Sequence, residues 1–431
     1  MNEIPQIFSN FAGMNINGKT WEFVKEHDGE DVRKVALLGC KDEEVDLTVA
    51  LQQIAGRQTA RRKLPTWAKT EGIIYPPHLN MEQCSSEQTA RYKSGLAAVP
   101  PTHHVPTDGQ EGLGGTFIDL TGGFGVDFYW MSQGFARRVY VEQNAGLCAV
   151  AEQNFQLLGL ECSVCCCDTA TYLAEMEGRA DVVYLDPARR NEQGGRTYGI
   201  EDCTPNVLEL LPLLMEKAGK VIVKLSPMLD WRKAVSDLSW VTEVHIVSVD
   251  NECKELVLVL EKKETQPLRL CCVNNESVFQ VFPLVENGVF HDGKRCFPWE
   301  KTVLPSEQPL FLFEPNASIM KAGCFAELEQ RLGVCQLAAN SHLFIADEDV
   351  ADFPGRRFHI EAVTTMNKQE LKAALSGLER ANIAVRNFPM SADQLRKKLK
   401  MKDGGDVFIF ATTTSDQQHG QHKLFICRKI G

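Results

Sequence analysis

The stretch that decides the fold is Asp119-Leu-Thr-Gly-Gly-Phe-Gly-Val-Asp127. A predicted strand ends at Asp119, a glycine-rich turn follows, and a helix then begins. Because glycine has no Cβ, the backbone of this turn can pass close to a ligand. In an open α/β sheet, the turn after the first strand faces the crevice in which ligands bind. The stretch therefore predicts the ligand-binding turn of such a sheet.

Strand-like and helical runs alternate after this turn. The strand-like runs cover residues 117–120, 138–142, 162–165, 181–185 and 220–224, and the helical runs between them cover 126–133, 145–158, 169–176 and 205–218. This order is typical of an α/β fold with a doubly wound, Rossmann-like parallel sheet. Two more strand-like runs, at 241–249 and 256–261, have no long helix between them and predict an antiparallel ending.

The composition on either side of the sheet predicts further regions. The N-terminal region reads as mostly helical: the run 45–63 ends before Pro65, and Ser85 followed by Gln88 is a capping-box pattern that begins another helix. We expect four regions: a helical N-terminal domain at 1–100, the α/β domain at 101–264, a small β-rich module at 265–308 and an α+β module at 309–431.

Length, composition and charge exclude several classes of protein. The 431 residues are 44% hydrophobic and 24% charged, which excludes a disordered or fibrous chain. No stretch approaches the roughly 18 apolar residues of a membrane-spanning helix, and residues 1–11 lack a signal-peptide pattern. We therefore expect a cytoplasmic protein without a membrane partner, whose 15 cysteines stay reduced. The net charge of −11 argues against nonspecific binding of nucleic acid by the whole surface.

Acidic residues follow four consecutive predicted strands. They are Asp119, Glu142, Asp168 and Asp186. Because the carboxyl ends of parallel strands meet at one edge of a sheet, these acids are expected to line one crevice. An acid after the second strand can hold both hydroxyls of a ribose. The alternative, that the acids cap helices, stays open and is strongest for Asp168.

The glycine pattern argues against a dinucleotide cofactor. A dinucleotide-binding turn needs a third glycine, but Phe128 stands in that place after Gly123 and Gly125. No Gly-Lys-Ser/Thr sequence follows, so a phosphate-binding loop is also absent. An acid directly before the glycines would repel a pyrophosphate. It suits a cationic ligand that carries an amino group and a sulfonium.

Further motifs carry a family resemblance over the whole chain. They are Glu82-Gln-Cys-Ser-Ser-Glu-Gln-Thr-Ala90, Tyr184-Leu-Asp-Pro-Ala-Arg-Arg190, Val223-Lys-Leu-Ser-Pro227, Asn251-Glu-Cys-Lys-Glu255 and Phe313-Glu-Pro-Asn-Ala-Ser-Ile-Met-Lys-Ala-Gly323. With the glycine-rich turn, they resemble the class I S-adenosylmethionine-dependent methyltransferases, and more closely the bacterial THUMP-like-domain-containing ones. The resemblance implies S-adenosyl-L-methionine as the cofactor, a ferredoxin-like module near 265–308 and a THUMP-like domain from about 309. Since THUMP domains are associated with RNA, it also implies an RNA substrate, tRNA or rRNA.

The resemblance assigns roles on the methyl-donor side. It implies six donor-binding residues: Asp119, Thr121, Gly123 and Gly125 in the turn, Glu142 at the ribose and Asp168 at the adenine amino group. Thr121 stands where the family usually has its first glycine.

On the acceptor side, Asp186-Pro187-Ala188-Arg189 matches the Asn/Asp-Pro-Pro-aromatic tetrad of amino-methylating enzymes. The Asp186 side chain and the Pro187 carbonyl would accept hydrogen bonds from the target amino group and aim its lone pair at the methyl. Arg189 replaces the aromatic residue, and a guanidinium plane can stack on a base or grip a phosphate. Tyr198 or Trp231 is an alternative source of a ring.

Basic residues are candidates for substrate binding. Arg190 either serves this role or pairs with neighbouring acids to fix the turn. Lys224, at the end of the fifth strand, is expected either to meet a phosphate or to pair with Asp186. The run 386–402 holds six basic residues and one acid, so Lys397 and Lys398 are candidates to track a phosphate backbone. A solvated amphipathic helix is the alternative for that run.

Other polar motifs carry weaker signals. Cys162 and Cys165 have metal-ligand spacing but no second pair, so we expect buried core thiols and no metal. A uridine-C5 methyltransferase would need a nucleophilic cysteine, and only Cys203 and Cys253 lie near, so this chemistry ranks lower. The glycines at 193–196 fit either a mobile lid or a solvated loop. Glu87 and Gln88, at the start of the helix before the sheet, either cover the donor pocket or simply cap the helix.

The sequence thus predicts a cytoplasmic methyltransferase that modifies an exocyclic base nitrogen in structured RNA, with no DNA partner. Two alternatives stay open: a methyltransferase for protein or a small molecule, and a donor-binding RNA module without turnover. The oligomeric state is not determined by the sequence.

Overall fold

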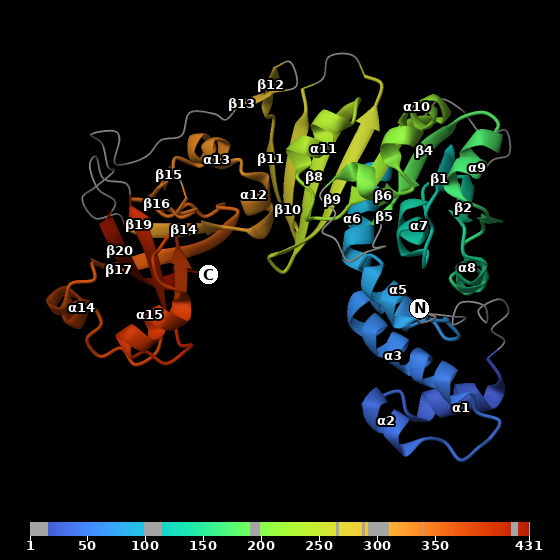
Figure 1. The fold of residues 1–431 in the computed structure, drawn as a ribbon, viewed down its shortest axis with the longest axis horizontal. Coiled ribbons are helices and arrows are strands. Elements are labelled where there is room, and N and C mark those ends of the chain that lie inside the picture. The colour runs from blue at the N-terminus through green and yellow to red at the C-terminus, as the bar shows by residue number, and fades with distance from the viewer. Residues whose placement is uncertain are drawn as a thin grey trace, which may run out of the picture. The chain divides into compact units, whose positions relative to one another are not determined.

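The computed structural model describes residues 16–98, 114–189, 199–263, 267–286, 289–291, 310–338, 340–414 and 421–430. The chain divides into two compact units (Figure 1). The first comprises Met1–Val244 and Leu256–Gln266, and the second comprises His245–Glu255 and Pro267–Gly431. The expected helical and α/β domains therefore share one unit, apart from a short segment within 245–255.

A parallel sheet forms the centre of the first unit. Its strands are β1 (Thr116–Asp119), β2 (Arg137–Glu142), β3 (Ser163–Cys166), β4 (Ala180–Leu185) and β7 (Ala218–Leu225), in the order β7-β4-β1-β2-β3. Strand β9 (Glu252–Glu261) pairs antiparallel with β7, and β8 (Val241–Val249) lies next to β9. The doubly wound prediction and its antiparallel ending are confirmed. The strand order reverses between β1 and β4, so the ligand crevice of this topology lies at their carboxyl ends.

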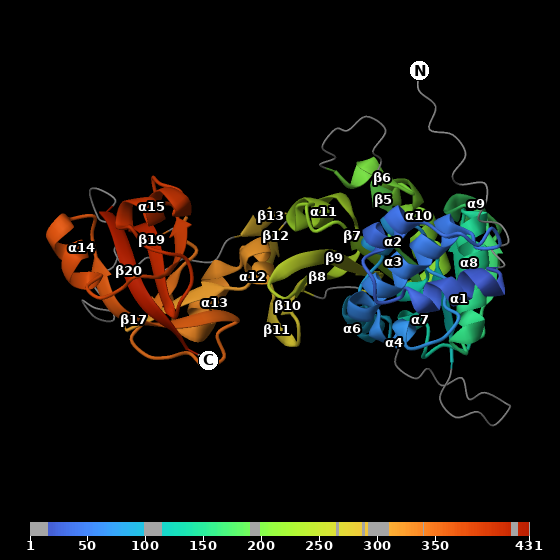
Figure 2. The same ribbon diagram turned by 90° about the horizontal axis from the view of Figure 1, so that it is seen from below.

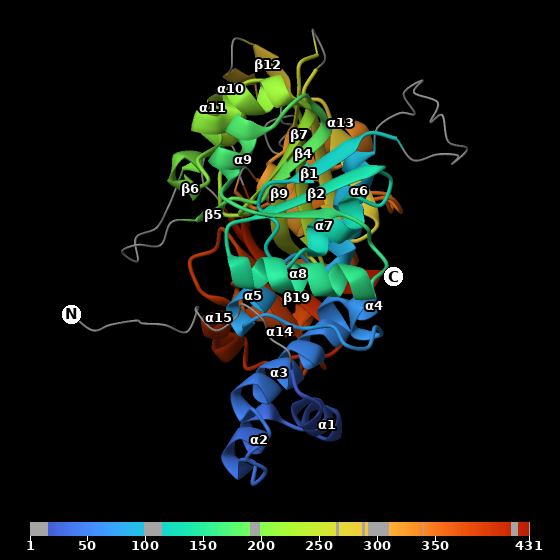
Figure 3. The same ribbon diagram turned by 90° about the vertical axis from the view of Figure 1, so that its right-hand side faces the viewer.

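Helices cover both faces of this sheet. Figures 2 and 3 show α9 (Thr169–Glu175), α10 (Val207–Lys217) and α11 (Trp231–Asp237) on one face, and α6 (Glu87–Ala97) and α7 (Val126–Met131) on the other. Helix α8 (Ala145–Leu157) follows β2. Side-chain caps fix where four helices begin, since each accepts hydrogen bonds from backbone N–H groups of the first turn. These caps are Asn144, Asp168, Asn206 and Asp230.

The N-terminal helices precede the sheet. They are α1 (Gly18–Glu26), α2 (Val32–Leu38), α3 (Leu47–Lys63), α4 (Pro65–Ala68), α5 (His78–Gln83) and α6. Helix α3 ends at Lys63, as Pro65 predicts. The cap of α6 is Ser86, whose side chain accepts from the Thr89 N–H, so the prediction of Ser85 was wrong by one residue. Among the described residues, no helix combines the length and apolar character needed to cross a membrane.

A seven-stranded sheet forms the largest part of the second unit. Its order is β15 (Cys335–Gln336), β16 (Phe344–Ala346), β14 (Phe311–Pro315), β17 (Gly355–Thr364), β20 (Gln421–Ile430), β19 (Val407–Thr414) and β18 (Asn382–Arg386). Leu395 of α15 (Ala392–Leu399) and Leu371 of α14 (Lys368–Ala374) pack on the cluster around Ile409 and Ile426. The remaining elements are the strands β10 (Arg269–Asn274), β11 (Ser277–Val281), β12 (Leu284–Glu286) and β13 (Val289–His291), and the helices α12 (Ala317–Ala322) and α13 (Phe325–Leu332).

A buried amide joins the N-terminal region to the sheet domain. The Asn154 side chain on α8 accepts from the Ile74 N–H and donates to the Ile74 carbonyl, both at 2.9 Å. Both residues are buried, so this side chain satisfies two backbone groups that water cannot reach.

We expect Asn154→Leu to lower the free energy of unfolding by about 2–4 kcal/mol, because it leaves two buried backbone groups of Ile74 unpaired. Denaturant unfolding measures this loss. The control is Gln153→Leu, which makes a similar exchange at an exposed position of the same helix and should change stability by less than about 0.5 kcal/mol. Equal losses in the two variants would contradict the role of Asn154.

Candidate active site

The glycine-rich turn between β1 and α7 is shaped by close aromatic neighbours. A Cβ at Gly122 would lie 2.1 Å from the Tyr140 ring, and a Cβ at Gly125 would lie 2.6 Å from the Phe155 ring. Gly125 also has a φ of +86°, which favours glycine. The hydroxyl of Tyr140 donates to the Gly123 carbonyl at 2.6 Å. These contacts with Tyr140 and Phe155 fix the conformation of the turn.

Glu142 connects the end of β2 to this turn. One carboxylate oxygen accepts from the Gly123 N–H at 2.9 Å, and the other accepts from the Asn144 N–H at 2.8 Å. These bonds fix the carboxylate beside the turn. Each oxygen retains acceptor capacity, as a carboxylate has about four lone-pair sites.

Asp119 lies beneath the turn and is 1% exposed. Its carboxylate accepts from the Thr121 N–H at 2.9 Å. Burial raises the pKa of Asp119 well above its usual value; the Thr121 bond opposes the shift, and the charges of Asp127, Asp186 and Glu142 add to it. A cation bound at this edge of the sheet would relieve the repulsion among these carboxylates.

Asp168 caps helix α9. It accepts from the N–H groups of Ala170 and Thr171, both at 3.0 Å, and from the Thr171 hydroxyl. These hydrogen bonds, that of the Thr171 hydroxyl first, lower the pKa of Asp168. The helix-cap interpretation thus describes what this carboxylate does, and its contact with an adenine amino group stays a prediction.

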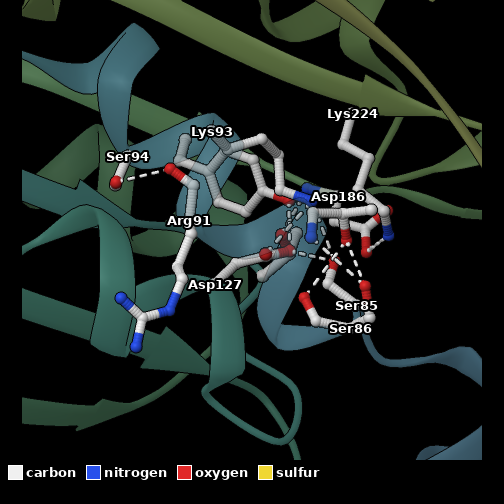
Figure 4. A network of polar contacts seen from close by, with 11 residues as sticks. Ser85, Ser86, Arg91, Lys93, Ser94, Asp127, Asp186 and Lys224 are labelled. Carbon is white, nitrogen blue, oxygen red and sulfur yellow. Dashed lines mark hydrogen bonds and ion pairs between the residues drawn. The ribbon is translucent and has the colours of Figure 1, made fainter. Parts of the chain in front are cut away.

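Asp186, at the end of β4, is tied to the turn and to β7. Its N–H donates to the Thr121 hydroxyl at 2.6 Å, and its side chain pairs with Lys224 (Figure 4). Lys224 was expected either to meet a phosphate or to pair with Asp186, and in the structure it pairs with Asp186. Burial raises the pKa of Asp186, and the Lys224 ammonium opposes this shift. The side chain remains 33% exposed, and Pro187 beside it is buried.

A second network, which the sequence did not reveal, surrounds Asp127 of α7. Its carboxylate accepts from the hydroxyls of Ser85 and Tyr184, both at 2.7 Å, and pairs with Lys93 at 3.1 Å. Lys93 is fully buried on α6. Burial alone would raise the pKa of Asp127, but the charges of Lys93 and Lys224 and both hydroxyl bonds outweigh it, so the pKa is lowered. The available signal was spacing, because Lys93 continues the buried stripe of Thr89 and Ala90.

Several candidates have structural partners or lie elsewhere. Glu87 accepts from the N–H and the hydroxyl of Thr66 and from Arg91, so it connects α4 to α6, whose cap is Ser86. Its place at the donor pocket stays a prediction. Trp231 is 3% exposed and presents no open ring. The backbone of Arg189 forms the short strand β5 (Ala188–Arg189), which pairs with β6 (Cys203–Thr204). Arg190, Tyr198 and the glycines at 193–196 lie outside the described residues.

The cysteines of β3 are less buried than expected. Cys162, which directly precedes β3, and Cys165 are half-buried and Cys166 is exposed, because β3 is the edge strand of the sheet. Within the described ranges, no group of three or more His, Cys, Asp or Glu side chains could hold a metal ion. Burial raises the pKa of Cys253 and disfavours its thiolate, which does not suit a nucleophile.

Lys397 and Lys398 are exposed on α15 of the second unit. Their neighbour Arg396 pairs with Asp393 and Asp403. Arg386, at the start of the basic run, instead pairs with the buried Glu314, which also binds Arg356. Part of the run is therefore occupied within the fold, and the two lysines are presented to solvent.

Comparison with known proteins places this site in a family context. A THUMP domain-like family model matches residues 355–429, and a ferredoxin-like domain model matches 311–354, C-terminal to the segment 265–308 where we expected that module. The crystal structure of a proposed methyltransferase from Porphyromonas gingivalis W83 is similar over 96% of this chain and 98% of its own, with 27% identity and a TM-score of 0.78. No curated protein matches the chain.

Other solved structures are similar over a smaller part of the chain. A proposed RNA methyltransferase from Pyrococcus horikoshii shares 16% identity over 46% of this chain and 96% of its own, with a TM-score of 0.29. TrmK of M. capricolum, solved with the cofactor product S-adenosyl-homocysteine, shares 12% identity over 35% of this chain and 63% of its own, with a TM-score of 0.27.

The sheet topology and the similarity to the Porphyromonas gingivalis structure identify a class I methyltransferase, a class that uses S-adenosylmethionine. More particularly, this methyltransferase carries a ferredoxin-like segment and a THUMP-like domain at its C-terminal end. The resemblance seen in the sequence is thereby confirmed.

Thr121 replaces a glycine of the family pattern, and its hydroxyl is the acceptor for the Asp186 N–H. We expect Thr121→Val to slow methyl transfer about tenfold, since an unpaired N–H costs about 1–2 kcal/mol and loosens Asp186. Single-turnover rates measure the effect. Thr121→Ser keeps the hydroxyl and should stay within about threefold of the wild type; equal rates for the two variants would contradict the role of this bond.

Proposed function

We propose that this protein transfers the methyl group of S-adenosylmethionine to an exocyclic base nitrogen in structured RNA, tRNA or rRNA, in the cytoplasm. The observation that carries the proposal is the hydrogen bond from the Asp186 N–H to the Thr121 hydroxyl, because it ties the backbone of the acceptor-side residue to the donor turn. The THUMP-like domain supports RNA as the substrate, because THUMP domains are associated with RNA.

The residues around the turn suit the methyl donor. The glycine turn leaves room for its amino acid portion, Asp119 faces its positive charge, Glu142 accepts from its ribose hydroxyls and Asp168 from its adenine amino group. When bound, the donor supplies an electrophilic methyl group on a sulfonium. The buried carboxylates favour that cation over a pyrophosphate.

The acceptor side can orient a nitrogen without a base of its own. One Asp186 oxygen is occupied by Lys224, and the other oxygen, with the Pro187 carbonyl, can accept the two hydrogens of a target amino group. The lone pair then points at the methyl, and this near-attack geometry lowers the barrier. After transfer, the proton leaves to water or to Asp186.

A ribose hydroxyl is the second candidate acceptor. The contact between Lys224 and Asp186 favours it, because an ammonium next to the acceptor stabilises a developing alkoxide. Arg189 favours it as well, since a ribose needs no aromatic platform of the kind that the tetrad supplies to a base.

Mass analysis of RNA nucleosides from cells with and without the gene tests both candidates. We expect one base-methylated nucleoside to disappear with the gene; loss of a 2′-O-methylated nucleoside would favour the hydroxyl, and an unchanged profile would remove the RNA substrate in favour of a protein or a small molecule. Donor binding without product from any substrate would indicate a binding module without turnover.

We expect Asp186→Ala to reduce the rate of transfer at least 100-fold while S-adenosylhomocysteine binding stays within about threefold, because Asp186 contacts the acceptor. Calorimetry and single-turnover rates separate these effects. The control is Asp237→Ala, which removes a surface partner of Lys233 and should leave the rate unchanged. A matching loss in both variants would argue against the assigned role.

RNA affinity through α15 is tested by Lys397→Glu combined with Lys398→Glu. We expect at least a tenfold weaker RNA affinity and a shallower salt dependence, with unchanged donor binding, because two phosphate contacts are lost. Lys368→Glu combined with Lys372→Glu is the control, because it makes the same change in net charge at two exposed positions of α14 in the same unit. If RNA affinity is untouched by the double reversal, RNA does not dock through this helix.

A further inference from the structure

Two lysine–carboxylate pairs lie next to one another at the acceptor side of the site. Lys224 of β7 pairs with Asp186, and Lys93 of α6 pairs with Asp127 at 3.1 Å (Figure 4). Lys93 is 0% exposed, so its pairing with Asp127 lies inside the protein. A buried ammonium is retained only where a carboxylate and further hydrogen bonds compensate its lost hydration.

Asp127 lies within electrostatic reach of both lysines. Besides its contact with Lys93, it feels the charge of Lys224, which helps to lower its pKa. Lys224 thus has two carboxylates that attract it, Asp127 and Asp186. If Asp127 had no cation of its own, it would compete with Asp186 for Lys224.

We propose that Lys93 is a positioning residue for the acceptor site: by neutralising Asp127, it leaves Lys224 in place on Asp186. This proposal rests on the proposed function, in which Asp186 meets the methyl acceptor. Lys93 touches neither substrate nor donor in this scheme and acts through Asp127 and Lys224. The helical region before the sheet thereby becomes part of the catalytic machinery.

Hydrogen bonds keep Asp127 on the Lys93 side. Lys93 donates to the Ser85 hydroxyl at 2.9 Å, and Ser85 in turn donates to Asp127. The Tyr184 hydroxyl donates to the same Asp127 oxygen as Ser85 does, from a position two residues before Asp186 on β4. Both hydroxyls favour the carboxylate form of Asp127.

The charges that face Asp186 come from four elements. They are Lys224 of β7, Asp127 of α7, Lys93 of α6 and Asp119 of β1. The two lysines favour the carboxylate form of Asp186, while burial and the two acids favour its protonated form. Moving Lys224 away from Asp186 would therefore shift the protonation of Asp186 to higher pH.

The test is Lys93→Met in the full-length protein, assayed on the RNA that the wild type methylates. We expect kcat to fall at least tenfold and the acidic limb of the kcat–pH profile to move up by about one unit, with S-adenosylhomocysteine affinity within threefold. The double variant Lys93→Met/Asp127→Asn removes both charges together, so Lys224 should stay on Asp186. Its acidic limb should return to the wild-type position.

A purely structural Lys93 would give another pattern: lower thermal stability with an unmoved acidic limb, which would overturn the proposal. Lys220→Met is the matched control, because Lys220 also links β7 to the end of α6 through the Leu96 and Ala98 carbonyls. It should cost stability without moving the limb.

If the Lys93→Met variant does not fold, the Tyr184→Phe variant tests the proposal in its place. It removes one hydrogen bond from Asp127 and should move the acidic limb in the same direction by a few tenths of a unit, whereas an unmoved limb would contradict the proposal. A wild type that methylates no RNA would instead refute the proposed function, which is a distinct result.

Discussion

Compensation of buried and half-buried negative charge is the constraint on which the site depends. Asp119, Asp127, Glu142 and Asp186 gather where β1, β2 and β4 end and α7 begins, and an isolated ion costs several kcal/mol away from water. The partners that compensate the charge differ from one carboxylate to the next. Glu142 accepts hydrogen bonds from backbone N–H groups, and Asp186 pairs with Lys224. Asp127 pairs with Lys93 and accepts from two hydroxyls. Asp119 has one backbone bond, so a cationic donor would complete it.

The alternation of strands and helices predicted the sheet because period and order are local properties of the chain. The edge of that sheet was not predictable in the same way. The thiols of β3 were expected in the core, but whether a strand is central or at the edge depends on the strand order, which the run Cys162-Ser-Val-Cys165 does not encode. The cap of α6 shows the smaller error. Ser85 fits the capping-box pattern with Gln88, but its hydroxyl donates to Asp127, and the neighbouring Ser86 accepts from the Thr89 N–H as the cap.

The candidate site was predictable where residues act next to their own strand. Asp119, Glu142 and Asp186 follow strands that the sequence located, and their gathering follows from parallel topology alone. The partners of these acids were harder to find. Lys93 and Asp127 are 34 positions apart and meet through the packing of α6 on α7, which no local pattern specifies. Thr121 was noted as a departure from a family pattern, and only the geometry gives the reason for it.

The hairpin of β8 and β9 has a consequence for how this architecture could have been assembled. Its base lies beside β7 in the first unit, while its tip at 245–255 belongs to the second, where the Asn251 side chain accepts from the Ala317 N–H at 2.8 Å. The chain therefore crosses between the units three times. A genetic exchange of the C-terminal portion at a single junction would separate the hairpin tip from its contact with Ala317. Recombination would have to transfer the tip as well, so we expect the two units to be inherited together.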